Sequence, residues 1–333
     1  MDPVTQGVLG ACAAQTRGAP KSLGKAAIIG ALAGMAPDLD VLIRSASDPL
    51  LMLDYHRQFT HSLFFIPFGG LLCAVVLHPL LGRRWGLSFR LVLLWCLFGF
   101  ATHGLLDWCT SYGTKLLWPL SDARYALDII SIIDPLFTLP LLFLTLCAAR
   151  TRRRLYVACT WGWCATYLAL GVVQHERAEA LARALAESRQ HRAERLEVKP
   201  SFANLAVWKS MYLHDGTLYV DAVKPGIVAS RIWPGQHIRL LDVRRDLPWL
   251  DPASQQARDI ARFHAASMGF IAVEPANPLH IGDMRYSLLP QQLGPLWRIV
   301  LSPAAPADAH VGFHVERLNA RAALNELIDM VFE

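Results

Sequence analysis

Five apolar runs that are nearly free of charge occupy the first 174 residues and constrain the fold more than any other feature. They are Ala26–Ile43, Ser62–Leu81, Leu91–Trp108, Pro135–Ala149 and Leu155–Val173. Each has about 15–20 residues, close to the ~20 that a helix needs to cross roughly 30 Å of hydrocarbon. The sequence therefore predicts a polytopic α-helical membrane domain over residues 1–174, with five spans and a short or re-entrant helix in Met1–Gln15.

Basic residues separate alternate runs and so predict the orientation of the chain. They are Arg17, Lys21 and Lys25 before the first run, Arg83, Arg84 and Arg90 between the second and third, and Arg150, Arg152, Arg153 and Arg154 between the fourth and fifth. Cytoplasmic loops collect Lys and Arg, so residues 44–61, 111–134 and everything after Val173 are expected on the opposite face. In a bacterium this predicts a multi-pass protein of the inner (cytoplasmic) membrane with a periplasmic C-terminal domain.

Charge divides the chain at Gln174 and narrows the choice of partner. Up to Gln174 there are 14 basic and 9 acidic residues, every acid an Asp, whereas the remainder has 18 of each. The net charge of +5 belongs to the apolar half, where the bases interrupt hydrophobic runs instead of lining a polar helix. Nucleic acid is therefore not expected as a partner, and the lipid bilayer is.

The second half of the sequence contains two segments of different composition and periodicity. Residues 175–198, HERAEALARALAESRQHRAERLEV, have the Ala/Glu/Arg/Leu composition of a connecting helix. Over residues 199–333, short alternating stretches such as TLYVDAV and HIRLLDV are broken by His-Asp-Gly and Lys-Pro-Gly turns. This pattern predicts a small soluble β-rich α+β domain on the extracytoplasmic side, closed by a helix over Val315–Phe332.

Ionisable side chains are few in the membrane half, and the predicted topology collects them toward the outer face. Those in the segments at the outer ends of the apolar runs are Asp38, Asp40, His56, Arg57, His61, His103, Asp107, Asp128 and Asp134. Such groups are costly near a bilayer and commonly mark function. The basic loops alone bring the four segments that carry them to one face, without any use of the motifs themselves.

The residue types in this set favour a metal centre. His103 and Asp107 are four residues apart, so on a helix they share a face and can bind one ion, whereas Asp38 and Asp40 suit a turn whose carboxylates converge on a cation. The predicted metal ligands are Asp38, Asp40, His56, His61, His103 and Asp107. Imidazoles mixed with carboxylates favour Zn²⁺, with Mn²⁺ or Fe²⁺ as alternatives. More than four ligands suggests more than one ion, as in metal-dependent phosphoester hydrolysis.

Two further residues are assigned catalytic roles, and each feature also has a purely structural interpretation. Arg57 would neutralise a phosphate through its bidentate guanidinium, and Asp134 would act as a base or orient other groups. Asp134 before Pro135 equally fits a helix N-cap. The His103 and Asp107 pair equally fits a hydrogen bond between packed spans.

At these same residues the chain resembles the YdjM-type family of inner-membrane, metal-dependent hydrolases. The similar segments are MDPVTQGVLGA, GMAPDLDVL, HRQFTHSLFF and HGLLDWCTSYGTKLLWPLSDARYALDIISIIDP, over about residues 1–174. The resemblance implies a helical membrane domain with a His/Asp metal centre, distantly similar to zinc-dependent phospholipase C and P1 nuclease, whose HxxxD element looks like His103 to Asp107. It carries over Asp38, Asp40, His61, His103 and Asp107 as ligands. Gln6 stands where many relatives have His, so the site is either one ligand short or Gln6 positions water.

The main hypothesis is a membrane-bound, metal-dependent hydrolase that acts on a phosphoester, with a lipid or lipid-linked substrate as one option, at the outer face of the membrane. Two alternatives stay open at this point. One is a transporter or channel whose membrane Asp and His residues relay protons or cations. The other is a membrane scaffold in which the metal is structural.

Overall fold

The computed structural model describes residues 1–226, 229–316 and 319–333, and the chain divides into two units. Unit 1 comprises Met1–Leu42, Tyr55–Val173 and Phe202–Asn204. Unit 2 comprises Ile43–Asp54, Gln174–Ser201 and Leu205–Glu333. The short segment Ile43–Asp54 lies in sequence between two parts of unit 1, yet it packs within unit 2.

Unit 1 is helical. Its helices are α1 (Pro3–Thr16), α2 (Leu23–Met35), α4 (Ile66–Leu77), α5 (Phe89–Cys109), α6 (Pro135–Thr151) and the first part of α7 (Arg154–Ser188), with short 3₁₀ segments η1 (Pro20–Ser22), η2 (Ala36–Leu42), η3 (Phe59–His61), η4 (Leu63–Phe65) and η6 (Arg83–Trp85), and a π-helical turn, η5 (His78–Gly82). The expected helix in Met1–Gln15 is confirmed as α1. It begins at an N-cap, Asp2, whose side chain accepts hydrogen bonds from the amides of Val4 and Thr5.

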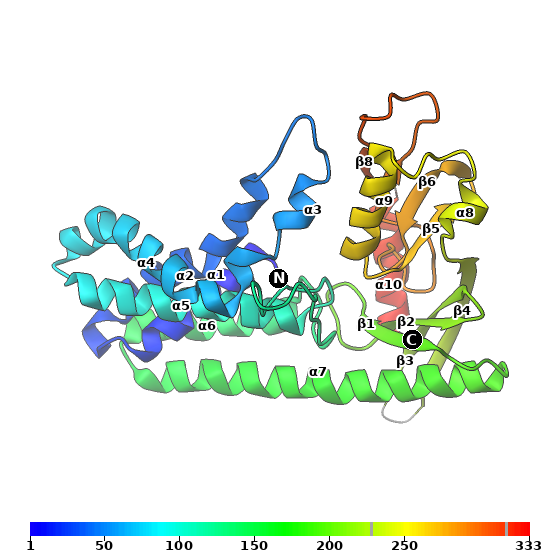
Figure 1. The fold of residues 1–333 in the computed structure, drawn as a ribbon. Helices are drawn as coiled ribbons and strands as arrows, with labels where there is room; N and C mark the ends of the chain where they lie inside the picture. The colour runs from blue at the N-terminus through cyan, green and yellow to red at the C-terminus, as the bar shows by residue number, and fades with distance from the viewer. Residues whose placement is uncertain (227–228, 317–318) are drawn as a thin grey trace. The chain divides into compact units, whose positions relative to one another are not determined.

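Helix α1 is the innermost helix of unit 1. All residues from Thr5 to Gln15 are buried, and α1, α2 and α5 pack against one another (Figure 1). Their approach depends on glycines, because a Cβ on Gly30 would overlap the carbonyl oxygen of Gly10, and a Cβ on Gly99 would overlap that of Gly30. Small residues at such crossings let helix backbones come close together inside membranes.

Three helical segments of the described residues are long and apolar enough to cross a membrane: Leu63–Trp85, Phe89–Cys109 and Arg154–Ser188. The expected count of five is not confirmed. Pro135–Thr151 is apolar but has only 17 residues. The expected first span divides, because α2 ends at Met35 and the chain continues as the 3₁₀ segment η2. Pro37 has no amide hydrogen for an α-helical bond, which favours the change of helix type at this point.

Unit 2 contains two four-stranded antiparallel sheets, as the β-rich texture predicts. The strands are β1 (Arg195–Pro200), β2 (Trp208–His214), β3 (Thr217–Lys224), β4 (Arg231–Arg239), β5 (Ile271–Glu274), β6 (Asn277–Asp283), β7 (Trp297–Val300) and β8 (Gly312–Val315). Each sheet follows chain order, β1-β2-β3-β4 and β5-β6-β7-β8. The His-Asp-Gly turn joins β2 to β3, with positive φ at Asp215 (48°) and Gly216 (68°), the backbone that a two-residue hairpin favours.

Besides the end of α7, further helices of the described residues accompany these sheets. They are α3 (Leu51–Tyr55), which begins in unit 2, α8 (Val243–Asp246), α9 (Gln255–Ala266) and α10 (Ala320–Phe332). The helix expected over 175–198 is the second part of α7, which runs unbroken from the last apolar run and ends at Ser188, and residues 195–200 form β1 instead. The expected closing helix begins at Ala320, not at Val315, which is in β8; Arg317 and Leu318 lie outside the described residues.

Candidate metal centre

Three elements of unit 1 bring the predicted ligands together. Helix α5 carries His103 and Asp107 one turn apart, both fully buried. The 3₁₀ segment η2 carries Asp38 and Asp40, and η3 carries His61. A 3₁₀ segment suits this task, because its tighter turn points neighbouring side chains in directions that an α-helix would not.

Asp38, His61, His103 and Asp107 form a group whose ligand atoms all lie within 4.8 Å of one another. The two imidazole Nε2 atoms are 2.9 Å apart. From Asp38 Oδ1 the distances are 3.4 Å to His61 and 3.3 Å to His103. From Asp107 Oδ2 they are 3.3 Å and 3.7 Å. A tetrahedral zinc with bonds of about 2.0–2.1 Å separates its ligand atoms by about 3.4 Å, and these separations of 2.9–3.7 Å lie on both sides of that value.

The ring of each histidine is oriented by a hydrogen bond through Nδ1. His103 Nδ1 lies 2.6 Å from the carbonyl oxygen of Gly34, to which it donates. The Thr60 hydroxyl donates to Asp40 Oδ2 (2.8 Å), so its oxygen is left to accept from His61 Nδ1 at 2.9 Å. When both rings are neutral, these contacts place the proton on Nδ1, so that both Nε2 lone pairs face the group, as metal-binding histidines require.

A second group consists of Asp40, His56 and His61. His56 Nδ1 donates to Asp40 Oδ1 at 2.8 Å, and the backbone amide of Arg57 lies 3.2 Å from Asp40 Oδ2. Asp40 Oδ2 is also 3.3 Å from His61 Nδ1. His61 thus belongs to both groups, with Nε2 toward the first and Nδ1 toward the second.

Arg57 lies beside the first group and is almost fully buried. Its Nε is 3.2 Å from Asp107 Oδ2, and one Nη donates to the Thr110 hydroxyl at 3.1 Å. The guanidinium also lies over the ring of Tyr112, 4.9 Å from its centre. The backbone of Arg57 has φ of 61°, a left-handed conformation that is uncommon for a long side chain and recurs at functional sites.

Gln6 joins this site from helix α1. Its side-chain nitrogen donates to Asp107 Oδ1 at 2.9 Å and approaches the carbonyl oxygen of His103 at 3.3 Å. The Gln6 carboxamide oxygen and Asp107 Oδ2 are both buried without a hydrogen bond from the part of the chain that the structure describes. Buried acceptors of this kind are uncommon. The charge of Arg57 lies 3.2 Å from Asp107 Oδ2, and a cation or an ordered water would satisfy the remaining hydrogen-bonding capacity. The amino group of Met1 also contacts Asp107 Oδ1.

Asp134 takes the position of a helix cap. It is the N-cap of α6, accepts from the amides of Leu136 and Phe137, and receives the Tyr167 hydroxyl at 2.8 Å on both oxygens. It is in neither group of candidate ligands. Asp128, the other acid before α6, has φ of 55° and is also in neither group.

Several partners at the site are not among the residues predicted from the sequence. Thr60 is adjacent to His61 in an ordinary FTHS run, the Gly34 contact uses a backbone carbonyl, and Tyr112 follows α5 in a loop. The signal that could have found Thr60 is the pairing of a hydroxyl with a neighbouring histidine, which commonly orients an imidazole. The Gly34 carbonyl is identifiable only once α2 and α5 are packed.

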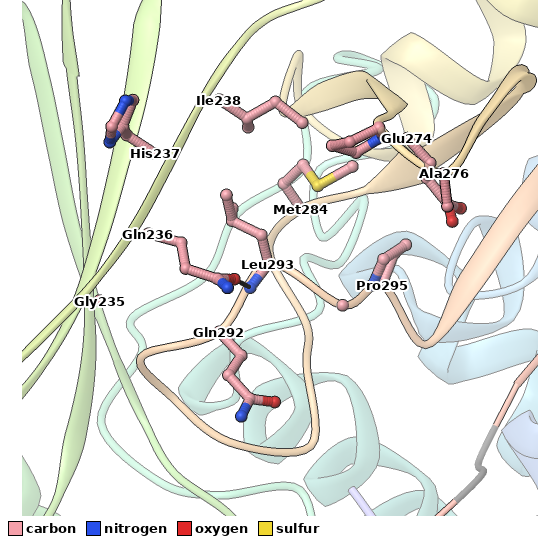
Figure 2. Close-up of a pocket in the computed structure, with 12 residues that line it drawn as sticks. Gly235, Gln236, His237, Ile238, Glu274, Ala276, Met284, Gln292, Leu293 and Pro295 are labelled. Atoms are coloured by element: carbon pink, nitrogen blue, oxygen red, sulfur yellow. Dashed lines mark hydrogen bonds between the residues drawn. The ribbon is translucent and has the colours of Figure 1, made fainter.

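The described part of unit 2 contains a cavity and a surface group that could hold a ligand. A cavity of about 770 Å³ is lined by Gln236, His237, Glu274, Met284 and Leu293, among others (Figure 2). In it the Gln236 side chain accepts from the amide of Leu293 at 2.9 Å. The group Glu194, His214 and Asp215 has ligand spacing but lies at the surface. Neither involves the predicted ligands, so the site of interest is the buried set in unit 1.

Apolar helices of membrane-crossing length around buried imidazoles and carboxylates define an α-helical membrane protein with a candidate metal centre. The chain belongs to the YdjM inner membrane protein family, whose family model matches residues 1–178. This confirms the resemblance seen in the sequence.

Two relatives are similar over part of the chain. One is the inner membrane protein YbcI of Escherichia coli (strain K12), 39% identical over 102 residues, which are 29% of this chain and 54% of YbcI. The other is the uncharacterized protein YfhP of Bacillus subtilis (strain 168), 29% identical over 119 residues, or 35% of each chain. The matched stretches thus span only about a third to a half of these relatives. No solved structure matches the chain significantly, and the distant similarity to phospholipase C and P1 nuclease stays a prediction.

Proposed function

We propose that this chain is a membrane-bound, metal-dependent hydrolase that acts on a phosphoester at the outer face of a bacterial inner membrane. The observation that carries the proposal is the group Asp38, His61, His103 and Asp107, in which two oriented imidazoles and two carboxylates have tetrahedral spacing. Their two negative charges would balance one divalent cation, and two histidine nitrogens with two carboxylate oxygens favour Zn²⁺ over Mg²⁺ or Ca²⁺. Mn²⁺ and Fe²⁺ are the alternatives.

The proposed centre holds one ion, bound by the first group. A neutral imidazole has a single lone pair, so His61 cannot offer Nε2 to one ion and Nδ1 to another. Its Nδ1 already lies within hydrogen-bond distance of Thr60. Asp40 and His56 then support the first group, and a second ion would require His61 to change partner.

The residues around the group would divide the work of hydrolysis. A cation held by Asp38, His61, His103 and Asp107 would supply an activated water and a positive charge for the phosphoryl oxygens. Arg57 holds Asp107 and adds a guanidinium for the phosphate charge. Gln6, through its buried carboxamide oxygen, would orient water. Asp38 is the most open of the four ligands, with its side chain 22% exposed, so substrate would approach from its side. Asp134 remains a helix cap in this scheme.

The membrane arrangement proposed here keeps five spans, with α2 and α6 as short ones. On α6 the exposed apolar residues Leu136, Leu139, Phe143 and Leu146 lie along one face of the helix, as a lipid-facing helix requires. Lys and Arg in alternate loops support a periplasmic position for the site and unit 2. A site at the outer leaflet favours a lipid or lipid-linked phosphoester.

The proposal is tested with purified full-length protein in lipid nanodiscs. The substrates are bis(p-nitrophenyl) phosphate and phosphatidylglycerol, each with and without added Zn²⁺. We expect zinc-dependent hydrolysis of at least one substrate that falls by more than about 100-fold in His103→Ala, beyond the usual effect of losing a supporting hydrogen bond. The matched control is His78→Ala, because the His78 side chain contacts the carbonyl of Leu87 and the ring of Phe89 and none of the candidate ligands; this variant should keep full activity.

Two results would contradict the proposal. Equal turnover by the wild type and His103→Ala would show that the reaction does not depend on the metal centre. Zinc binding without turnover, together with an ion flux in liposomes that Asp40→Asn abolishes, would favour a transporter instead.

A further inference from the structure

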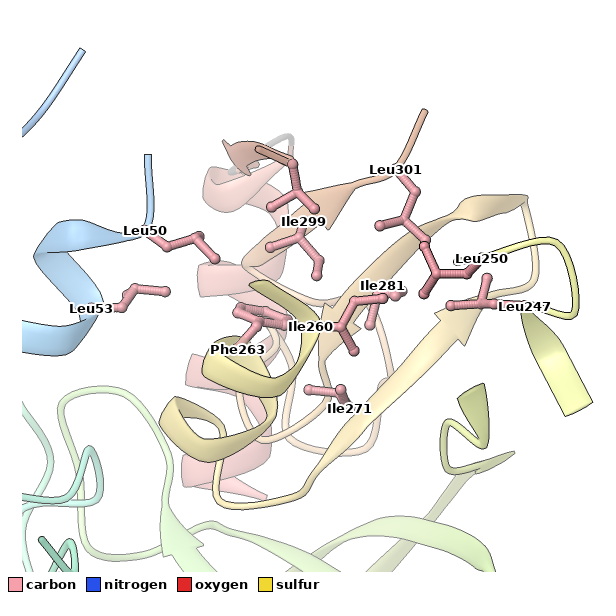
Figure 3. Packing of buried hydrophobic residues seen from close by; sticks show 11 residues of the cluster. Leu50, Leu53, Leu247, Leu250, Ile260, Phe263, Ile271, Ile281, Ile299 and Leu301 are labelled. Carbon is pink, nitrogen blue, oxygen red and sulfur yellow. The ribbon is translucent and has the colours of Figure 1, made fainter. Parts of the chain in front are cut away.

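The segment Ile43–Asp54, here called the arm, leaves unit 1 and packs entirely within unit 2. Leu50 is fully buried there and Leu53 nearly so, in a hydrophobic cluster with Ile260 and Phe263 of α9 (Figure 3). The same cluster includes Ile271, Ile281 and Ile299 of the second sheet. Burial of the two leucines in this cluster stabilises the packing of the arm.

Arg262 of α9 binds the middle and the C-terminal end of the arm. Its two Nη atoms pair with the two oxygens of Asp48 at 3.0 and 2.9 Å. Its Nε and one Nη reach Asp54 Oδ2 at 2.9 and 2.6 Å, and its other Nη lies 2.9 Å from Asp259. One guanidinium thus engages three carboxylates, a geometry that the planar fork of arginine permits and an ammonium does not.

The charges around Arg262 make this attachment firm. Partial burial would raise the pKa of Asp48, but the hydrogen bonds from Arg262 and the Leu50 amide and the charge of the guanidinium outweigh it, and that pKa is lowered. His310 also faces this cluster, 2.8 Å from Asp259 and 3.8 Å from Asp48. Asp48 therefore stays ionised and paired at neutral pH.

Residues of the candidate metal centre flank the arm on both sides. Asp40 lies three residues before Ile43, and His56 lies two residues after Asp54. These two side chains bond each other at 2.8 Å, and the next amide, that of Arg57, bonds Asp40 as well. The arm is therefore a loop. Its two ends meet at the candidate site, through Asp40 and His56, and its middle and C-terminal part are fixed by Arg262 and the leucine cluster.

We propose that unit 2 positions the metal centre through the arm, with Arg262 as the positioning residue. A loop held at its far end has fewer conformations, so Asp40 and His56 meet with a smaller loss of entropy. Asp40 in turn holds Thr60 and faces His61. Loss of the Arg262 contacts would therefore make Asp40 more mobile, and through Asp40 and Thr60 it would weaken the orientation of His61, a ligand of the first group. This inference rests on the proposed function, because it needs the metal centre.

The test uses full-length protein in nanodiscs and two arginine variants of the same unit. Arg262→Met removes the arm contacts, and Arg298→Met is the matched control, because Arg298 also bridges two carboxylates, Glu274 at 2.7 Å and Glu316 at 2.5 Å, away from the arm. Zinc affinity is measured by competition with a chromophoric chelator, and hydrogen exchange of residues 43–58 is measured without metal. We expect Arg262→Met to weaken zinc binding about 10- to 100-fold and to speed exchange in the arm, whereas Arg298→Met does neither. Arg262→Lys, which keeps the charge without the fork, should fall between.

The outcomes separate the two proposals. A wild type that binds no zinc overturns the proposed function and this inference with it. Zinc that binds the wild type, Arg262→Met and Arg298→Met equally well overturns the positioning role alone. A loss of exchange protection beyond residues 43–58 in Arg262→Met would show that Arg262 stabilises the fold as a whole, and would overturn the positioning role. An equal loss of zinc affinity in Asp48→Asn, with faster exchange only in residues 43–58, would support the positioning role.

Discussion

At the scale of single residues, the chemistry of the site depends on side chains that orient other side chains. The residue types of the ligands, and the spacing of His103 and Asp107, are visible in the sequence because they fall in apolar runs where charge is rare. Their orienting partners are not, since Gly34 contributes only a carbonyl and Thr60 is an ordinary hydroxyl beside His61. Sequence reasoning therefore predicts which side chains gather but not which nitrogen of each imidazole faces the group.

The role of Thr60 gives a prediction at this scale. Thr60→Val keeps the shape of the side chain but removes both the donor to Asp40 Oδ2 and the acceptor for His61 Nδ1. Zinc affinity should fall by about tenfold, the lower range for the loss of a partner that orients a ligand. Thr151→Val is the control, because the Thr151 hydroxyl bonds only the carbonyl of its own helix at Cys147 and, through its oxygen, the amide of Arg153. Zinc affinity is measured by competition with a chromophoric chelator. Equal affinities in Thr60→Val and Thr151→Val would refute the orienting role of Thr60.

At the scale of elements, two features decide whether the ligands meet. The change from α2 to η2 near Pro37 points Asp38 and Asp40 toward η3, and the sequence indicates it, because proline in an apolar run marks a break. The close crossing of α1, α2 and α5 is not visible in the same way, since glycines are common in membrane helices. The pairing of particular glycines is fixed only by the packed helices.

That crossing predicts the effect of a single methyl group. In Gly30→Ala the new Cβ meets the carbonyl of Gly10 and the Cβ of Ala14, so α2 must move, and with it the Gly34 carbonyl that orients His103. Overpacking of this kind costs about 1–3 kcal/mol. Thermal unfolding in nanodiscs should therefore shift to lower temperature, and zinc affinity should fall.

Gly162→Ala is the matched control for this change. Gly162 lies on α7, where a Cβ would meet no described atom within 4 Å beyond its chain neighbours and the adjacent backbone of its own helix, and alanine is the better helix former. This variant should keep or slightly raise the unfolding temperature and bind zinc as the wild type does. A Gly30→Ala protein as stable as Gly162→Ala would contradict the close crossing.

At the scale of the whole molecule, the sequence predicts two dissimilar halves, and the structure contains a helical unit and a unit with two antiparallel sheets. The periodicity of the strands and the length of the apolar runs are local properties, so both are readable along the chain. The membership of the arm in unit 2 is not, because it depends on Arg262 meeting Asp48 across 214 positions of sequence. Run length alone does not determine the number of spans. Ala26–Ile43 is one continuous apolar run, yet it changes from α-helix to 3₁₀-helix after Met35.

The most direct test of the central claim is X-ray absorption at the zinc edge of the purified wild-type protein, together with its metal content. The account predicts one tightly bound zinc per chain with a first shell of nitrogen and oxygen at about 2.0–2.1 Å, including two imidazoles, and loss of that signal in His103→Ala. Protein without stoichiometric metal would contradict it. So would a sulfur shell at about 2.3 Å, which would assign the ion to the cysteines of the membrane half.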